Sequence, residues 1–176
     1  MAVASEAKMR TLLNAAFAGL LLAFAIGTAS AQDAPAGAIL TITDGEESVE
    51  FDRDKLGAMK QEVVETSVPW LDDDADSKWP RGVARFSGPT FTDILNEVGF
   101  AGETVTATAA DGYSIEIPRA RLTGDGAILA TGVNDAPLPA DKAPHWIVFP
   151  YDQGPEINDE DHESWSVWKV TTLTVK

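Results

Sequence analysis

The stretch TVTATAADGYSIEIP at residues 104–118 constrains the fold more than any other part of the chain. In both of its arms apolar and polar side chains alternate. This period of two places successive residues on opposite faces of a β-strand. Asp111 and Gly112 separate the arms, and this pair favours a tight turn because glycine adopts a positive φ angle without steric cost. The stretch therefore predicts an antiparallel hairpin, in which Asp-Gly-Tyr forms the turn rather than a binding motif.

The N-terminal segment has the pattern of a secretory signal. Two basic residues precede the apolar run 12–27, and a small-residue ASA sequence ends at Ala31. The apolar run is shorter than the roughly 20 residues needed to span a membrane. We expect a signal peptide over residues 1–31, followed by a single mature domain over residues 32–176. The expected location is periplasmic or secreted, with no membrane insertion after cleavage; an uncleaved anchor helix is the alternative.

Charge and cysteine content narrow the chemistry. The chain has 28 acidic and 13 basic residues, a formal net charge of −15, and no cysteine. A field of this sign repels nucleic acids and anionic lipid surfaces, so we expect neither as a partner. It suits a soluble protein, a cationic partner or calcium. Without cysteine the chain has no thiolate nucleophile, no thiolate metal ligand and no redox pair.

The remaining pattern is one of short strands with two short helices. Strands are predicted by alternating runs at 38–42, 47–51, 62–68, 126–131, 145–151 and 165–175. One helix begins after Asp52, and a clearer one begins after Thr90 and ends at Gly99. Residues 69–89 and 154–164 are predicted to be irregular loops. This pattern indicates an α+β fold with mostly antiparallel β-structure.

From about residue 79 onward, several motifs occur in a familiar order. They are WPRGV, FTDILNEVGF, ATAADGYSIEIP, GAILATGVNDAPL, PHWIVFP and WSVWKVTTLTV. This order resembles the oxidoreductase molybdopterin-binding domain, the fold shared by sulfite oxidases and their bacterial periplasmic relatives. The resemblance implies the sulfite oxidase fold, an oxidoreductase activity and a molybdopterin cofactor. It also implies an architectural role for the Asp-Gly-Tyr turn.

The sequence departs from the family where the metal would be bound. In the enzymes that it resembles, a cysteine between an early strand and the helix with the D-I/L-L pattern binds molybdenum. The corresponding residues 65–88 contain no cysteine, and an oxygen ligand does not reproduce the electronic properties of a soft thiolate. The family's arginine near G-x-P-L-R is also missing, since this place reads KAPHWIVFP. We therefore expect the chain to keep the fold of this family and to lack its usual cofactor. Only the family resemblance, and no residue of this sequence, points to molybdopterin.

The most prominent candidates for a binding surface are aromatic. Trp70 and Trp79 lie in the 69–89 loop, and partly exposed aromatic side chains supply binding area. The alternative is that these indoles fill the core and hold the loop, as we expect for Trp165 and Trp168. The candidate ligand or partner surface comprises Trp70, Trp79, Arg81, His145, Trp146 and Tyr151.

Two acidic segments have partial metal-site patterns. Asp72, Asp74 and Asp76 have the D-x-D-x-D spacing of a calcium loop, but Val83 occupies the twelfth position, where a glutamate should close the site. His162 lies among acids that could also bind a divalent ion. Because runs of acidic residues usually face water, we expect solvated loops and no metal.

No catalytic residue is predicted, since the sequence has no G-x-S-x-G, H-E-x-x-H or P-loop motif. The sequence therefore favours an exported, non-catalytic domain that binds a small ligand or a periplasmic partner protein, in a sensory or redox system. A divergent molybdopterin-dependent oxidoreductase, or a subunit of one, is an alternative. An acidic calcium-dependent binding module is another.

Overall fold

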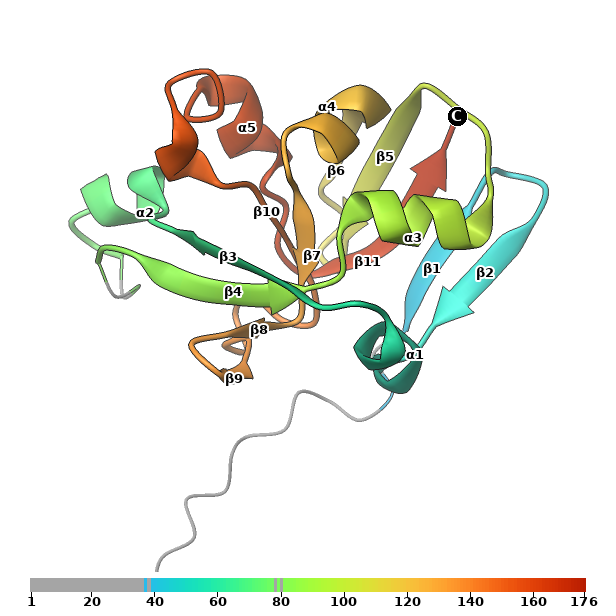
Figure 1. The fold of residues 1–176 in the computed structure, drawn as a ribbon, viewed down its shortest axis with the longest axis horizontal. Coiled ribbons are helices and arrows are strands. Elements are labelled where there is room, and N and C mark those ends of the chain that lie inside the picture. Colours follow the sequence, from blue (N-terminus) through green and yellow to red (C-terminus); the bar gives the residue numbers. More distant parts are fainter. Residues whose placement is uncertain (1–36, 38, 78, 80) are drawn as a thin grey trace, which may run out of the picture.

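The structure is a computed structural model that describes residues 37, 39–77, 79 and 81–176 (Figure 1). The predicted signal segment, residues 1–31, lies outside the described residues. Among the described residues, no helix has both the length and the apolar character required to cross a membrane.

The larger sheet brings the two ends of the domain together. Its strands, in spatial order, are β2 (Ser48–Phe51), β1 (Leu40–Thr43), β11 (Val170–Val175), β5 (Thr104–Ala109) and β6 (Ser114–Pro118). The β1–β11 pair is parallel, and the other neighbours in this sheet are antiparallel. The strand nearest the C-terminus therefore lies in the middle of the sheet.

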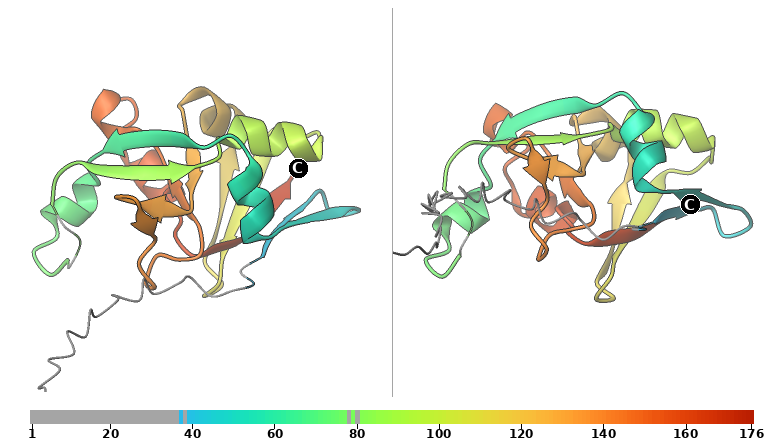
Figure 2. Two further views of the ribbon diagram at one scale, coloured as in Figure 1. Left: turned by 60° about the horizontal axis from the view of Figure 1, so that its bottom comes forward. Right: turned by 90° about the horizontal axis from the view of Figure 1, so that it is seen from below.

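Two smaller antiparallel sheets complete the β-structure. One contains β3 (Glu62–Thr66), β4 (Ala84–Gly88), β8 (Gly132–Val133) and β9 (Ala136–Pro137), in that order. The other pairs β7 (Ile128–Ala130) with β10 (Trp146–Val148). Figure 2 shows β3 and β4 on one side of the molecule and β11 on the other. Phe86, Trp146 and Leu173 contribute fully buried side chains to this core.

The described residues contain five α-helices and a short 3₁₀ helix. They are α1 (Arg53–Ala58), α2 (Pro69–Asp73), α3 (Phe91–Val98), α4 (Arg119–Gly124), α5 (Glu160–Trp165) and η1 (Tyr151–Gln153). Helix α3 begins as predicted, because the Thr90 side chain accepts a hydrogen bond of 3.0 Å from the Asp93 amide. It ends at Gly99, whose φ of 71° is a left-handed conformation that glycine adopts readily. The Asp52 side chain caps α1 in the same way, through a 2.7 Å bond from the Lys55 amide.

The predicted α+β class with mostly antiparallel strands is confirmed, but two predicted loops are wrong. Residues 69–89 contain α2 and β4. Pro69 suits the first turn of a helix, because its fixed φ is already helical and its missing N–H would lack a partner there. Residues 154–164 include most of α5, and the last strand begins at Val170 rather than at residue 165.

The hairpin prediction is confirmed. Strands β5 and β6 pair in antiparallel register, and Gly112 in the turn has a φ of 91°. The Ala109 amide donates a 2.8 Å hydrogen bond to the Tyr113 carbonyl, which closes the turn. Tyr113 follows the glycine with its side chain 50% exposed, so the turn also places an aromatic ring at the surface.

Candidate functional site

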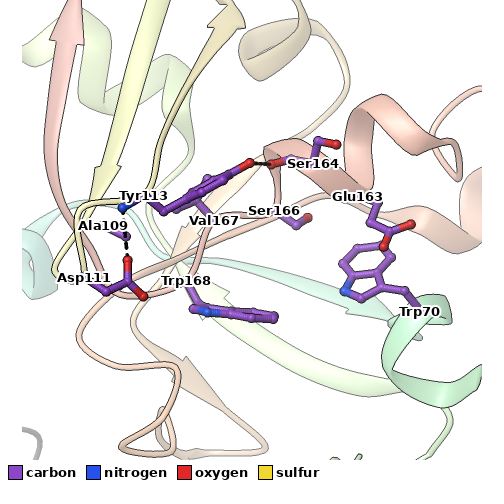
Figure 3. Close-up of a pocket in the computed structure, with 9 residues that line it drawn as sticks. All are labelled: Trp70, Ala109, Asp111, Tyr113, Glu163, Ser164, Ser166, Val167 and Trp168. Carbon is purple, nitrogen blue, oxygen red and sulfur yellow. Dashed lines mark hydrogen bonds between the residues drawn. The ribbon is translucent and has the colours of Figure 1, made fainter. Parts of the chain in front are cut away.

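Two cavities lie on either side of Trp168. The first, here called the Trp79 cavity, has a volume of about 760 Å³ and includes Trp79, Asp141 and Lys142 in its lining. The second, here called the Trp70 cavity, has a volume of about 340 Å³ and is shown in Figure 3. Because Trp168 lines both, its indole forms the wall between them.

Trp79 is held by other aromatic rings. Its ring stacks on Phe86 at a centroid distance of 5.9 Å and meets the edge of Trp146 at 5.2 Å. Among the described residues, no hydrogen-bond acceptor reaches the buried Nε1 atom of Trp79 or of Trp146. Burying an N–H group without an acceptor costs free energy. The Trp79 side chain therefore offers its ring surface, and not its N–H group, to the Trp79 cavity.

Lys142 provides a hydrogen-bond donor in the Trp79 cavity. The residue is only 9% exposed, and its Nζ atom lies 3.3 Å from the centroid of the Trp168 ring. Burial lowers the pKa of Lys142 below its ordinary value, and the neighbouring Asp141 carboxylate opposes this effect. The distance from Nζ to Asp141 Oδ2 is 3.7 Å, which is too long for a hydrogen bond. The ammonium group therefore has donor capacity for a ligand.

The Trp70 cavity draws its walls from separate parts of the chain. Trp70 comes from α2, Tyr113 from the β5–β6 turn, Glu163 from α5, and Trp168 from the segment before β11. The Tyr113 hydroxyl donates to the Ser164 carbonyl at 3.4 Å, which connects the turn to α5. Asp111, at the tip of the hairpin, adds a second carboxylate to the lining.

Contacts between the α2 region and the η1 region hold the Trp70 wall in place. The Trp70 ring meets the Tyr151 ring edge-on at 4.8 Å, and the Tyr151 hydroxyl shares a short hydrogen bond with Ser166. Burial raises the pKa of Tyr151, so its phenol stays protonated at neutral pH. Asp152 also accepts hydrogen bonds from the amide and the hydroxyl of Ser67, just before α2.

The six residues predicted to form one surface do not do so. His145, Trp146 and Tyr151 are 3%, 0% and 1% exposed, so their prediction as surface residues is wrong. Trp146 lies on a strand whose residues are all buried, because other elements cover both faces. The His145 ring bonds through Nδ1 to the Val170 carbonyl at 2.8 Å, and burial lowers its pKa. These three side chains support the cavities from within.

The other three residues of the predicted surface, Trp70, Trp79 and Arg81, lie in different places. Trp70 and Trp79 are half-buried, as a binding role requires, but they line different cavities. Arg81 is exposed beside Gly82, whose amide donates to the Asp72 carboxylate. Lys142 and Glu163 were missed, because nothing in their local sequence distinguishes them from other surface charges, and Asp111 was assigned only to the hairpin turn.

The acidic segments have structural roles in this fold. Asp74 accepts a hydrogen bond from the Asp76 amide at 2.9 Å, which forms a local turn. His162 is fully buried, so its prediction as part of a solvated loop is wrong. Its ring nitrogens lie 2.7 Å from Asp159 Oδ1, at the N-cap of α5, and 3.1 Å from Asp125 Oδ2, at the C-cap of α4. Among the described residues, no group of three or more histidine, cysteine or acidic side chains is placed to hold a metal ion.

The sheets that carry these cavities have the fold of a molybdopterin-binding oxidoreductase domain. The sulfane dehydrogenase SoxCD from Paracoccus pantotrophus has a similar structure, with a TM-score of 0.59 and 16% sequence identity. The similarity covers 80% of this chain and 38% of that one, so this chain spans well under half of the enzyme's length. Residues 40–151 match the oxidoreductase molybdopterin binding domain model, and the chain belongs to this family. No curated protein matches the sequence.

The residues of this chain do not fit the family's molybdenum centre. A soft thiolate donor is absent from the whole sequence. In residues 65–88, where the cysteine is expected, the polar side chains serve the fold: Ser67 bonds Asp152, and Asp72 bonds the Gly82 amide. Val68, beside Ser67, is fully buried. The donor set in this segment therefore differs from the one that a thiolate-ligated molybdenum requires.

Proposed function

We propose that this chain is an exported, non-catalytic member of the family that binds a small ligand in the Trp79 cavity. The observation that carries the proposal is the Lys142 ammonium group, which lies over the Trp168 ring in a cavity of about 760 Å³ that Trp79 also lines, in a chain without cysteine. The signal-like pattern of residues 1–31 supports an exported protein that is periplasmic or secreted.

The lining of the cavity indicates the chemistry of the ligand. Lys142 donates hydrogen bonds, so the ligand should present an acceptor such as a carbonyl or a single carboxylate. Asp74, Asp76 and Asp141 also line the cavity and would repel a molecule with several negative charges. A small molecule with one acceptor end and an otherwise neutral body satisfies both conditions.

The first test measures the metal. The full chain, with its N-terminal segment, is expressed in a bacterium that makes molybdopterin, and the exported protein is purified. Elemental mass spectrometry should find no stoichiometric molybdenum, the denatured protein should release no fluorescent pterin, and the intact mass should show cleavage after Ala31. Stoichiometric molybdenum would overturn the proposal in favour of a divergent molybdopterin enzyme. A calcium ion bound to the native state would raise the melting temperature, because a ligand of the native state stabilises the fold. Since we expect no calcium site, adding calcium or a chelator should leave the melting temperature unchanged.

The second test addresses the cavity. Melting temperatures are recorded with a panel of small carboxylates and amides for the wild type and for Lys142→Met. At least one compound should stabilise the wild type, by about 2.7 kcal/mol at a hundred times its dissociation constant. That gain should be lost in the variant.

Lys55→Met is a matched control, because Lys55 also lies over an aromatic ring, Phe51, at 3.8 Å, but not in the Trp79 cavity. It should keep the response of the wild type. A panel without any stabilising compound, or an equal loss in both variants, would refute the assignment of this cavity.

A further inference from the structure

The Trp70 cavity has the opposite chemistry to the Trp79 cavity. Its lining includes three aromatic side chains, Trp70, Tyr113 and Trp168, and two carboxylates, Asp111 and Glu163. None of the described residues in this lining is a lysine or an arginine. With a volume of about 340 Å³, the cavity lies at the lower end of the size range of small-molecule sites.

The aromatic side chains border the cavity on several sides. In Figure 3 the Tyr113 and Trp168 rings lie above and below the opening, and Trp70 lies at its side with Glu163 above it. Tyr113 is half exposed, and its hydroxyl lies 3.4 Å from the Ser164 carbonyl, to which it donates a long hydrogen bond. The rings are therefore held around an accessible space instead of collapsing into the core.

The electrostatic character of this region favours a positive ligand. The faces of aromatic rings carry partial negative charge and attract ammonium groups. Trp168 already does so with Lys142, whose Nζ atom lies 3.3 Å from its centroid. Trp70 and Glu163 also border a neighbouring cavity that contains Asp73, Asp159 and Glu160, which extends the acidic surface. The net charge of −15 adds a general attraction for cations.

We propose that the Trp70 cavity binds a small organic cation with an alkyl-substituted ammonium head group. Such a head group is weakly hydrated and contacts ring faces directly, and the carboxylates of Asp111 and Glu163 neutralise its charge. A bare metal ion would need several oxygen ligands, and two carboxylates between three rings do not supply them. This inference goes beyond the proposed function, because it concerns a separate cavity and a ligand of opposite charge.

The shared wall predicts how the two sites affect each other. Lys142 lies over the Trp168 ring and lines the Trp79 cavity, so its charge opposes a cation in the Trp70 cavity. Lys142→Met should therefore bind the cation more tightly, by about two- to fivefold. A purely structural role for Trp168 does not produce this gain.

The test compares choline with 3,3-dimethyl-1-butanol, its neutral carbon isostere, by calorimetric titration and tryptophan fluorescence. Choline should bind with a dissociation constant in the range of about 1 mM, and the isostere should bind at least about tenfold more weakly. Glu163→Gln and Tyr113→Leu should each weaken choline binding about fivefold. Asp161→Asn is the matched control, because Asp161 is exposed on the same helix and does not line the cavity.

Four outcomes would overturn the inference. They are absence of choline binding, equal binding of choline and its isostere, an unchanged affinity in Glu163→Gln, and an equal loss in Asp161→Asn. A peptide with one trimethyllysine provides a further arm, and tighter binding of the peptide than of choline would assign the cavity to a protein side chain. Unchanged melting temperatures confirm that the variants fold. The proposed function is tested by the molybdenum content and by the Lys142-dependent response, whereas this inference is tested by choline binding. Failure of one proposal can therefore be told apart from failure of the other.

Discussion

Asp152 holds together two segments that are 85 residues apart and that set the position of α2. Its carboxylate accepts a 2.7 Å hydrogen bond from the Ser67 amide and a 2.5 Å bond from the Ser67 hydroxyl. The Asp152 amide donates in turn to Thr66 Oγ1 at 3.2 Å. Asp152→Ala removes both acceptors and leaves the half-buried Ser67 amide without its partner, so the fold should lose stability.

The size of the loss follows from these contacts. A hydrogen bond to a charged group contributes about 1.5–3 kcal/mol, but Ser67 is half-buried and Asp152 is exposed, so water replaces part of the interaction. We expect Asp152→Ala to lower the free energy of unfolding by about 2 kcal/mol. With a urea m-value of about 2 kcal/mol/M, the unfolding midpoint should fall by about 1 M.

Urea denaturation followed by tryptophan fluorescence measures this change. Asp152→Asn keeps one acceptor oxygen and should lose about half as much stability. In a double-mutant cycle, Ser67→Ala and Asp152→Ala should show a coupling energy of about 1 kcal/mol. A loss below about 0.5 kcal/mol, or a coupling energy of zero, would refute the role given to this contact. The Trp70 cavity would then need another explanation for the fixed position of its α2 wall.

Three further predictions concern the fold. Burial lowers the pKa of His145 below its ordinary 6.5, so protonation favours the unfolded state; the resulting stability is complete above pH 6.5 and declines as the pH falls below it. His145→Gln should flatten the dependence of the melting temperature on pH in this acidic window. A side chain at Gly88 would overlap the Leu129 carbonyl, so Gly88→Ala should lower the unfolding free energy by about 3 kcal/mol, whereas Gly57→Ala, which has open space, should raise it by up to about 1 kcal/mol in the same urea assay. Thr90→Ala removes the cap of α3 and should cost about 1 kcal/mol by thermal unfolding.

The parts of the fold that were predicted correctly have local signals. The β5–β6 hairpin follows from alternation and an Asp-Gly turn, and α3 from its apolar spacing and the caps at Thr90 and Gly99. Helices α2, α4 and α5 have only five or six residues, so a periodic pattern cannot develop in them. Their formation depends on packing against the sheets. Strand β4 was missed because turn-forming residues surround a segment of five residues.

The candidate site was predictable only in part. Trp70 and Trp79 were recognised because aromatic residues in a presumed loop are unusual, and both line cavities. The burial of Trp146 depends on elements that cover β10 from both sides, which a strand pattern does not reveal. Tyr113 was assigned to the turn, and its place in a cavity wall arises because α5 packs beside the hairpin. The contact between Lys142 and Trp168 joins distant parts of the chain and leaves no local signal.

The central position of β11 has a consequence for the order of assembly. This strand lies between β1 and β5, yet it is made after both of them. During synthesis, the β1–β2 and β5–β6 hairpins therefore keep an unpaired edge until residues 170–175 emerge. Contacts between strands so distant in sequence form slowly, and open edges favour association with other chains. Cotranslational folding therefore cannot complete the larger sheet before its last strand has been made.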